Sequence, residues 1–176
     1  MKKIKKNLKN FYKKIIQVFF KFLYGDIKGK TSHFDSKDIV LIEVEIDKNN
    51  YKIYNCTECS LYTDTIHNTA IINKGKIVNG PSFQLRNNIN VDCMNNSVIS
   101  KGTPRFKKKI KGKVVSLLTG GGGNSNYWHW MFDVLPRLNI IKNKDFVFNY
   151  YLFPDLSQKF QNETLDLLQI SEKKRL

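Results

Sequence analysis

The feature that most restricts the fold of this chain is the predominantly apolar run Lys-Val-Val-Ser-Leu-Leu over residues 113–118, which is followed after Thr119 by four consecutive glycines. Such a run is typical of a strand that is buried on both faces of a parallel sheet. The capping residues Asn124–Asn126 then predict a helix that begins near Tyr127. Residues 146–153 predict a second strand, and residues 162–170 predict a second helix. The order strand, helix, strand, helix predicts an α/β fold that opens a Rossmann-like, doubly wound domain.

Residues 31–112 are expected to form a β-rich segment ahead of this domain. Residues 39–46 end in alternating apolar and acidic positions and are rich in β-branched side chains, which predicts a strand. Residues 70–78 predict a hairpin in whose turn either Asn73 or Gly75 takes a positive φ. Val98–Ile99 predicts one more short strand. The segment therefore has the pattern of a small sheet.

Residues 1–30 contain most of the positive charge, with ten Lys and a single acidic residue, Asp26, so that they supply +9 of the formal charge of +15. Apolar residues recur there at spacings of three and four, which predicts an amphipathic helix. The most apolar stretch, Ile15–Tyr24, is much shorter than the roughly 20 residues that cross a bilayer. It also lacks a small-residue cleavage site before Gly25, so neither a membrane span nor a signal peptide is expected.

Two interpretations of this basic helix remain open at the level of sequence. A Lys-rich face opposite Phe, Ile and Leu suits a helix that lies in the interface of an anionic membrane. This predicts a cytoplasmic protein that is peripheral on the inner face of the cytoplasmic membrane. Alternatively, the helix packs its apolar side on the domain and points its lysines into water.

The cysteines indicate a reducing compartment. Cys56, Cys59 and Cys93 are an odd number of cysteines with no secretory signal ahead of them, which favours free thiols. Cys56 and Cys59 have the spacing of half a zinc site, but a structural zinc site needs four ligands. No metal is therefore expected, and no cofactor is predicted.

The remaining positive charge lies in a second cluster between Arg105 and Lys113. Of the 30 basic residues in the chain, 26 are Lys and only four are Arg, whereas specific nucleic-acid readout favours Arg. No nucleic-acid recognition motif accompanies the lysines. Nucleic acid is therefore not an expected partner.

The candidate chemistry lies on the predicted helix after the glycines. At about 100° per residue, His129, Asp133 and Arg137 fall on one stripe of that helix. A carboxylate one turn from a histidine holds the imidazole in one tautomer and stabilises its protonated form, as a general base requires. The alternative is a surface pair of Asp133 and Arg137 worth a few tenths of a kcal/mol, with His129 simply exposed.

The opposite stripe of the helix is apolar and is expected to pack on the sheet; it consists of Tyr127, Met131, Val134 and Leu138. Trp128, Trp130 and Phe132 border the polar stripe. The glycines Gly120–Gly123 lack both the Walker pattern and the dinucleotide-binding spacing, so they predict a sharp, mobile turn.

Residues 126–138, which read Asn-Tyr-Trp-His-Trp-Met-Phe-Asp-Val-Leu-Pro-Arg-Leu, resemble a motif of the family 61 glycosyltransferases. The family pattern is Asn-Tyr-x-His-Trp-hydrophobic-x-Asp-x-Leu-Pro-Arg-Leu. Residues 70–80 resemble the β-rich region upstream of that motif, and residues 151–170 resemble the strand and helix after it. The resemblance covers residues 60–176.

The resemblance implies transfer of a hexosyl or pentosyl group from a nucleotide sugar to a glycan, on a GT-B-like fold, in capsular or other surface polysaccharide assembly. The acceptor is then a glycan, often lipid-linked, and the nucleotide sugar is a substrate rather than a cofactor. In this reading His129 and Asp133 are catalytic. The substrate-binding residues that the motif implies are Arg137, Trp128, Trp130, Asn126 and Tyr127. The two tryptophans would stack on sugar rings, and the alternative for one of them is a place in the core.

Members of the family continue into a second α/β domain that holds most of the nucleotide-sugar site, and residues 1–176 contain no counterpart of it. The sequence is therefore expected to have three parts: the basic helix at 1–30, the β-rich segment at 31–112 and the start of the α/β domain at 113–176. As a function, we expect a truncated glycosyltransferase. The alternative is a non-catalytic remnant that binds carbohydrate or membrane.

Overall fold

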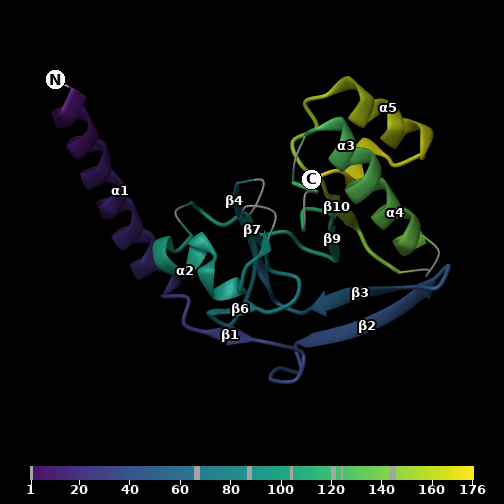
Figure 1. Ribbon diagram of the computed structural model, residues 1–176, viewed down its shortest axis with the longest axis horizontal. Helices are drawn as coiled ribbons and strands as arrows, with labels where there is room; N and C mark the ends of the chain where they lie inside the picture. Colours follow the sequence, from purple (N-terminus) through teal and green to yellow (C-terminus); the bar gives the residue numbers. More distant parts are fainter. Residues whose placement is uncertain are drawn as a thin grey trace.

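The computed structural model describes residues 2–65, 68–86, 89–103, 105–119, 122–123, 125–142 and 146–176. These residues form a mixed α/β structure, as the sequence predicts, with strands in the middle of the chain and most of the helical structure toward its two ends (Figure 1). The glycines Gly120 and Gly121 and the capping candidate Asn124 lie outside the described residues.

The N-terminal helix α1 spans Lys2–Tyr24 and contains neither proline nor glycine. It ends at Gly25, which takes the left-handed φ of 77° that commonly closes a helix and donates its amide to the carbonyl of Lys21 at 2.8 Å. The helix extends along one flank of the molecule, and its N-terminal end lies far from the sheets (Figure 1). Among the described residues, no helix combines the length and apolar character that a membrane crossing requires.

A long antiparallel hairpin follows, made of β2 (Ile39–Ile46) and β3 (Asn49–Cys56). All eight residues of one strand pair with the eight of the other. Asp47 and Lys48 form the two-residue turn, with φ of 49° and 65°, which matches the twist of an antiparallel pair. The strand predicted over residues 39–46 is confirmed at both ends.

The second sheet is built around β5 (Asn68–Asn73), which pairs with β4 (Ser60–Thr65) along one edge and with β6 (Lys76–Val78) and β7 (Phe83–Arg86) along the other. The short strands β1 (Lys30–Thr31) and β8 (Ile89–Asn90) complete it. The predicted hairpin over residues 70–78 is confirmed. Its turn is formed by Lys74 and Gly75, both with positive φ.

The strand predicted at Val98–Ile99 is wrong, because these residues lie in the short helix α2 (Ser97–Lys101). A 3-10 turn over Cys93–Asn95 leads into it. The Asn96 side chain accepts a hydrogen bond from the amide of Val98 at 3.0 Å, which caps the helix, and Gly102 ends it with φ of 68°. Local capping chemistry therefore overrides the β propensity of two branched residues. Val98 is buried against the sheet with Ala70, Ile72, Ile77 and Cys93.

The C-terminal part contains the predicted alternation of strands and helices. Strands β9 (Val114–Ser116) and β10 (Tyr150–Leu152) pair in parallel. Between them runs one continuous helix, assigned as α3 (Tyr127–His129), a π-helical segment (Trp130–Val134) and α4 (Leu135–Lys142). Both strands are shorter than expected, and Val114 is exposed, so the apolar run is not buried on both faces along its whole length.

The last helix, α5 (Lys159–Leu167), begins three residues before the predicted start because Gln158 and Gln161 form a reciprocal cap. The amide of Gln158 donates to Oε1 of Gln161 at 3.0 Å. Leu165 of this helix is buried in the core, whereas Leu167 is 82% exposed.

The chain then returns to the parallel strands through the 3-10 turn Glu172–Lys174. Arg175 bridges to Tyr151 in parallel register, and the amide of Leu176 donates to the carbonyl of Tyr151 at 2.9 Å. Residues 175–176 therefore add a third parallel segment beside β10. Around these strands lies the larger core, whose buried members are Leu117, Trp130, Val134, Leu138, Ile141, Tyr151, Phe153, Leu165 and Ile170.

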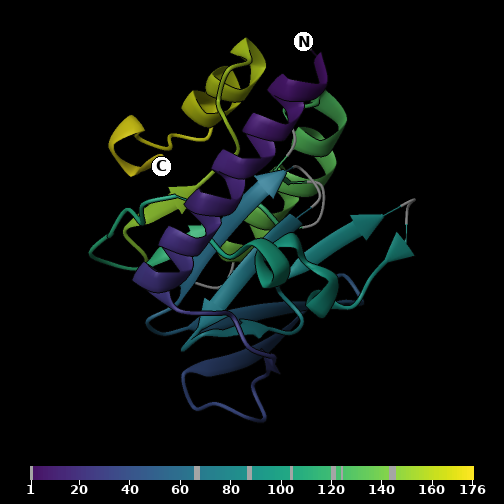
Figure 2. The ribbon, with the colours of Figure 1, turned by 90° about the vertical axis from the view of Figure 1, so that its left-hand side faces the viewer.

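One buried contact connects the β-rich segment with the C-terminal part. Thr69, on the central strand β5, donates its hydroxyl to the carbonyl of Leu118 at 3.1 Å. Leu118 lies just beyond the end of β9, so the sheet supports the segment that leads from β9 toward the helix. Figure 2 shows the molecule from the side of α1, and α1 lies in front of the sheets in this view.

Candidate functional site

The helix that carries the motif residues begins where the sequence predicts. Asn126 has extended backbone angles, and its side chain accepts a hydrogen bond from the amide of Trp128 at 2.8 Å. Its carbonyl accepts from the amide of Trp130 at 3.0 Å. Asn126, which the resemblance assigns to substrate binding, therefore serves as the N-cap of this helix.

The next five residues, Trp130–Val134, form a π-helical segment in the middle of the helix. The amide of Leu135 donates to the carbonyl of Trp130, five residues earlier. Such single π turns are uncommon and occur frequently at functional sites, because they alter the direction in which neighbouring side chains project. The segment contains Asp133 and begins one residue after His129. The irregularity therefore coincides with the predicted catalytic pair.

His129 and Asp133 are brought together as the sequence predicts. Nδ1 of His129 lies 2.6 Å from Oδ2 of Asp133, and both side chains are about one-third exposed. With the neutral imidazole donating Nδ1–H to the carboxylate, Nε2 carries the lone pair and can accept a proton. The negative carboxylate also stabilises the imidazolium that forms afterwards. This is the arrangement that a general base needs.

Arg137 is directed toward the segment that follows β9. Its Nη1 donates to the carbonyl of Leu117 at 3.1 Å and also to the carbonyl of Thr119. Burial lowers the pKa of the guanidinium, and the charge of Asp133 acts in the opposite direction. Arg137, which the resemblance assigns to substrate binding, therefore holds the helix to the end of the strand.

The glycine turn packs directly against this arginine. Gly122 is buried, and a Cβ atom placed on it would overlap the carbonyl oxygen of Leu117 and lie 2.7 Å from Nη1 of Arg137. Glycine is therefore needed at this position for close packing. The rest of the predicted turn, at Gly120 and Gly121, lies outside the described residues.

Trp130 is the tryptophan that lies in the core, so its side chain is not exposed to a substrate. The side chain is completely buried and its indole Nε1 donates to the hydroxyl of Thr164 at 2.8 Å. Its ring lies 5.9 Å from that of Phe153. Trp130, rather than Tyr127, joins Val134 and Leu138 on the buried face; these three residues follow one another at a spacing of four, about one helical turn.

Trp128 and Phe132 form an exposed aromatic pair on the same helix. Their ring centroids are 4.3 Å apart, and the side chains are 65% and 61% exposed. They lie one position before His129 and Asp133, so the aromatic pair and the polar pair form adjacent stripes. Sequence reasoning placed Phe132 at the border of the site without assigning it a function. Its spacing of four residues from Trp128 is the signal that would have identified it.

Tyr127 occupies the first turn of the helix and is also exposed, contrary to its predicted place on the buried stripe. Its ring packs edge-on against Phe160 of α5 at a centroid distance of 5.0 Å. Met131 is half-buried against the core. The aromatic rings on the stripe next to the His129–Asp133 pair are therefore those of Trp128 and Phe132, whereas Tyr127 lies against α5.

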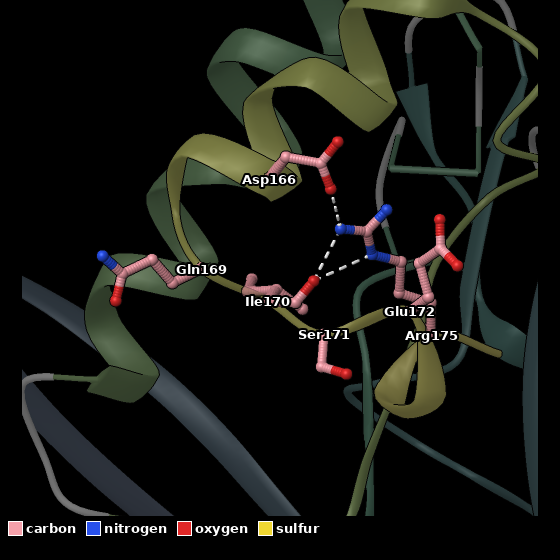
Figure 3. Close-up of a pocket in the computed structure, with 6 residues that line it drawn as sticks. All are labelled: Asp166, Gln169, Ile170, Ser171, Glu172 and Arg175. Atoms are coloured by element: carbon pink, nitrogen blue, oxygen red, sulfur yellow. Dashed lines mark hydrogen bonds and ion pairs between the residues drawn. The ribbon is translucent and has the colours of Figure 1, made fainter.

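A separate hollow lies near the C-terminus and contains none of the predicted site residues (Figure 3). Arg175 is directed into it, but its guanidinium is engaged by the protein. Nε and Nη2 donate to the carbonyl of Ile170 at 3.0 and 2.6 Å, and Nη2 pairs with Asp166. These bonds fix the turn after α5, so Arg175 has a structural role at this hollow.

Within the described ranges, no three His, Cys, Asp or Glu side chains gather closely enough to hold a metal ion. Cys56, Cys59 and Cys93 are free. In three comparisons, the chain matched no protein-family model, no curated protein and no solved structure. Function is therefore inferred from residues 126–138 and their geometry.

Proposed function

We propose that this chain is the acceptor-side part of a glycosyltransferase that resembles family 61, with a Rossmann-like α/β domain that begins at residue 113. The observation that carries the proposal is the 2.6 Å contact between Nδ1 of His129 and Oδ2 of Asp133, located at a π-helical turn. The parallel order of β9 and β10, with residues 175–176 beside β10, supports the fold assignment.

In the proposed reaction, the acceptor hydroxyl oxygen bonds to the anomeric carbon of the donor sugar while the bond from that carbon to the nucleotide diphosphate breaks. The hydroxyl proton passes to Nε2 of His129, and Asp133 stabilises the resulting imidazolium. The partial exposure of both side chains leaves them accessible to such an acceptor. Attack from the side opposite the leaving group gives inversion at the anomeric carbon.

The exposed rings of Trp128 and Phe132 would bind the acceptor sugar. Flat aromatic surfaces beside polar groups suit the apolar faces and the hydroxyls of a sugar ring. Large exposed aromatic side chains that lie together also mark binding sites more often than isolated ones do. In this proposal the nucleotide sugar is bound by a second α/β domain. The resemblance to family 61 is the basis for placing this reaction in the assembly of a surface polysaccharide.

The decisive experiment measures glycosyl transfer to a glycan acceptor by this chain combined with the donor-binding domain. His129→Ala is expected to lower turnover by at least about 100-fold, as the loss of a general base does. His33→Ala is the matched control, since His33 lies in the loop between β1 and β2, with its ring 3.9 Å from that of Phe34, and its removal should leave turnover unchanged. Unchanged turnover in His129→Ala would reject the catalytic role.

A second candidate function, carbohydrate binding without catalysis, is favoured by the aromatic pair alone. It predicts that Trp128→Ala and Phe132→Ala weaken glycan binding by the isolated chain, while His129→Ala leaves it unchanged. Binding can be measured by isothermal titration with oligosaccharides. Glycan binding combined with no transfer in the reunited protein would select this second function.

A further inference from the structure

The two basic clusters of the sequence lie about 80 residues apart but meet at the base of α1. The amide of Lys107 donates to the hydroxyl of Tyr24 at 3.0 Å, and the ammonium group of the same lysine lies 4.4 Å from the centroid of the Tyr24 ring. Phe106 packs edge-on against Phe20 at 5.1 Å and contacts Phe19 at 6.3 Å. The loop 105–113 is thus attached to the last turns of the helix.

The contacts that attach α1 define which side of the helix faces the body. Among the side chains that the structure describes in α1, from Lys6 onward, Phe20 is the buried one, and it stacks on Tyr24 at 5.8 Å. Lys21 lies against Gly102 at the end of α2 and pairs with Asp26 at 3.1 Å. These contacts come from the final turns alone. The preceding turns extend away from the sheets (Figure 1).

The apolar side chains of α1 are on the side that these contacts leave uncovered. At 100° per residue, the apolar residues from Leu8 to Leu23 other than Phe20 occupy an arc of about 160°, with Phe20 and Tyr24 outside it. No lysine between Leu8 and Leu23 falls in this arc. All nine members of the arc are substantially exposed, and Phe22 is 89% exposed; they are Leu8, Phe11, Tyr12, Ile15, Ile16, Val18, Phe19, Phe22 and Leu23. The helix therefore does not pack its apolar side on the domain.

The loop 105–113 adds both an apolar side chain and basic side chains next to the apolar arc of α1. Phe106 is 75% exposed beside Phe19, so it continues the apolar arc. The six basic residues of the loop are all exposed; they are Arg105, Lys107, Lys108, Lys109, Lys111 and Lys113. No acidic residue occurs before Asp26, and none occurs between Asp92 and Asp133. The helix and loop therefore present apolar side chains flanked by positive charge alone.

We propose that α1 and the loop 105–113 form one docking surface for an anionic lipid membrane, with the apolar arc of α1 and Phe106 inserted at the headgroup level. A bilayer surface satisfies both features, because acyl chains accept the aromatic and aliphatic side chains while anionic headgroups neutralise the lysines. A second copy of the same surface would bring like charges together, which opposes self-association through α1. The inference is independent of the proposed transfer reaction.

The first test is sedimentation of the full chain with vesicles of phosphatidylcholine alone or mixed with about equal phosphatidylglycerol. Binding is expected on the anionic vesicles and should fall steeply when NaCl rises from about 0.1 to about 0.5 M, since salt screens surface charge. Equal binding to both vesicle types, or none to either, would overturn the proposal.

Paired variants test the two parts of the surface. Phe11→Ser combined with Phe22→Ser should lower the partition coefficient by at least about tenfold, since both rings leave the apolar arc. Phe34→Ser combined with Val147→Ser is the control, because these side chains are exposed elsewhere. Equal losses in the two pairs would contradict the assignment of the apolar arc. Far-UV circular dichroism checks that each variant retains its helices.

For the loop, Lys108→Gln, Lys109→Gln and Lys111→Gln together should weaken binding at least about tenfold, because each cation near an anionic surface contributes separately. The matched control removes the same charge at exposed lysines elsewhere, namely Lys37, Lys48 and Lys173. If the control variant loses as much vesicle binding as the loop variant, binding depends on net charge only and the loop is not part of the docking surface.

A probe on the helix itself distinguishes lipid insertion from binding to a soluble polyanion. Phe22→Trp should show a blue-shifted emission on anionic vesicles and quenching by lipids brominated in the upper acyl chain. An acidic polysaccharide should produce neither effect. Absence of quenching on vesicles that bind the protein would overturn insertion of the apolar arc.

Discussion

Nη1 of Arg137 donates to the carbonyl of Leu117 at 3.1 Å. This bond connects the motif helix, the continuous helix from Tyr127 to Lys142, to the end of strand β9. The same nitrogen also reaches the carbonyl of Thr119, and the guanidinium is largely buried. The arginine therefore satisfies backbone acceptors that strand pairing leaves open. It also fixes the distance between the strand and the helix that carries His129.

Replacement of Arg137 should consequently destabilise the fold. Arg137→Met removes the donor to two carbonyls and is expected to lower the free energy of unfolding by about 2–3 kcal/mol, the usual cost for a buried charged hydrogen bond. Urea denaturation followed by circular dichroism measures this. Arg105→Met, at an exposed position, is the control and should change stability by less than about 0.5 kcal/mol. Similar values for both variants would contradict the anchoring role.

Gly122 should be equally sensitive, for a steric reason. Gly122→Ala places a methyl group against the carbonyl oxygen of Leu117, so the turn must move and the free energy of unfolding should fall by about 1–3 kcal/mol. Gly25→Ala is a suitable comparison, because open space surrounds Gly25 and its cost is limited to the left-handed backbone, about 1–2 kcal/mol.

The two glycine variants differ further in their effect on Arg137. The clash at Gly122 also displaces Nη1, so Arg137→Met combined with Gly122→Ala should cost less than the sum of the single variants. The effects of Gly25→Ala and Arg137→Met should add. Strict additivity in both pairs would show that the glycine turn and the arginine do not interact.

Several parts of the fold follow from local sequence, because short-range chemistry determines them. Asn126 caps the motif helix, Gly75 allows the tight turn of the β5–β6 hairpin, and the alternation in residues 39–46 produces β2. The spacing of His129 and Asp133 brings their side chains together on one helix. In each case the interacting groups are within a few residues of one another.

The parts that sequence reasoning missed depend on contacts between distant residues. Trp130 is buried because Thr164 offers its indole a hydrogen-bond acceptor on α5, 34 residues away. Arg137 meets carbonyls about 20 residues earlier. The uncovered apolar arc of α1 follows from the contacts of Phe20 with Phe106. No periodicity in the chain encodes such partners.

The tautomer of His129 provides a direct test of the catalytic pair that needs no substrate. In nitrogen-15 spectra of the full chain near about pH 8, where an ordinary imidazole is neutral, Nδ1 of His129 should carry the proton and Nε2 should be unprotonated. Asp133→Ala should abolish this preference. Asp155→Ala, which removes an exposed carboxylate elsewhere, should leave it unchanged. A protonated Nε2 in the unmodified chain would exclude its use as a base.

The cysteines should differ in reactivity although all three are free. A hydrogen bond from Cys56 lowers the pKa of the Cys59 thiol, and the same contact raises the pKa of Cys56. Burial raises the pKa of Cys93. Since the thiolate is the nucleophile, iodoacetamide should modify Cys59 before Cys56 and Cys93.

The pH dependence of the alkylation rate tests whether the contact with Cys56 makes Cys59 the most reactive thiol. A lowered pKa means that Cys59 is ionised at a lower pH than an ordinary thiol, so its alkylation rate should level off at lower pH. Cys56→Ala removes the hydrogen-bond donor and should shift that profile to higher pH. Mass spectrometry of peptides from partially alkylated protein measures each site. An unshifted profile in Cys56→Ala would contradict the assigned hydrogen bond.

The two tryptophans of the chain provide the last prediction, because they lie two residues apart on one helix in opposite environments. In Trp130→Phe the remaining indole, Trp128, should be quenched efficiently by acrylamide, whereas in Trp128→Phe the buried Trp130 should be protected. Loss of the bond to Thr164 should lower the free energy of unfolding of Trp130→Phe by about 1–2 kcal/mol, and Trp128→Phe should cost less than about 0.5 kcal/mol. Addition of a glycan ligand should then protect Trp128 from acrylamide and leave Trp130 unaffected. If an oligosaccharide binds the chain but protects neither indole, the pair Trp128–Phe132 is not part of the sugar-binding site.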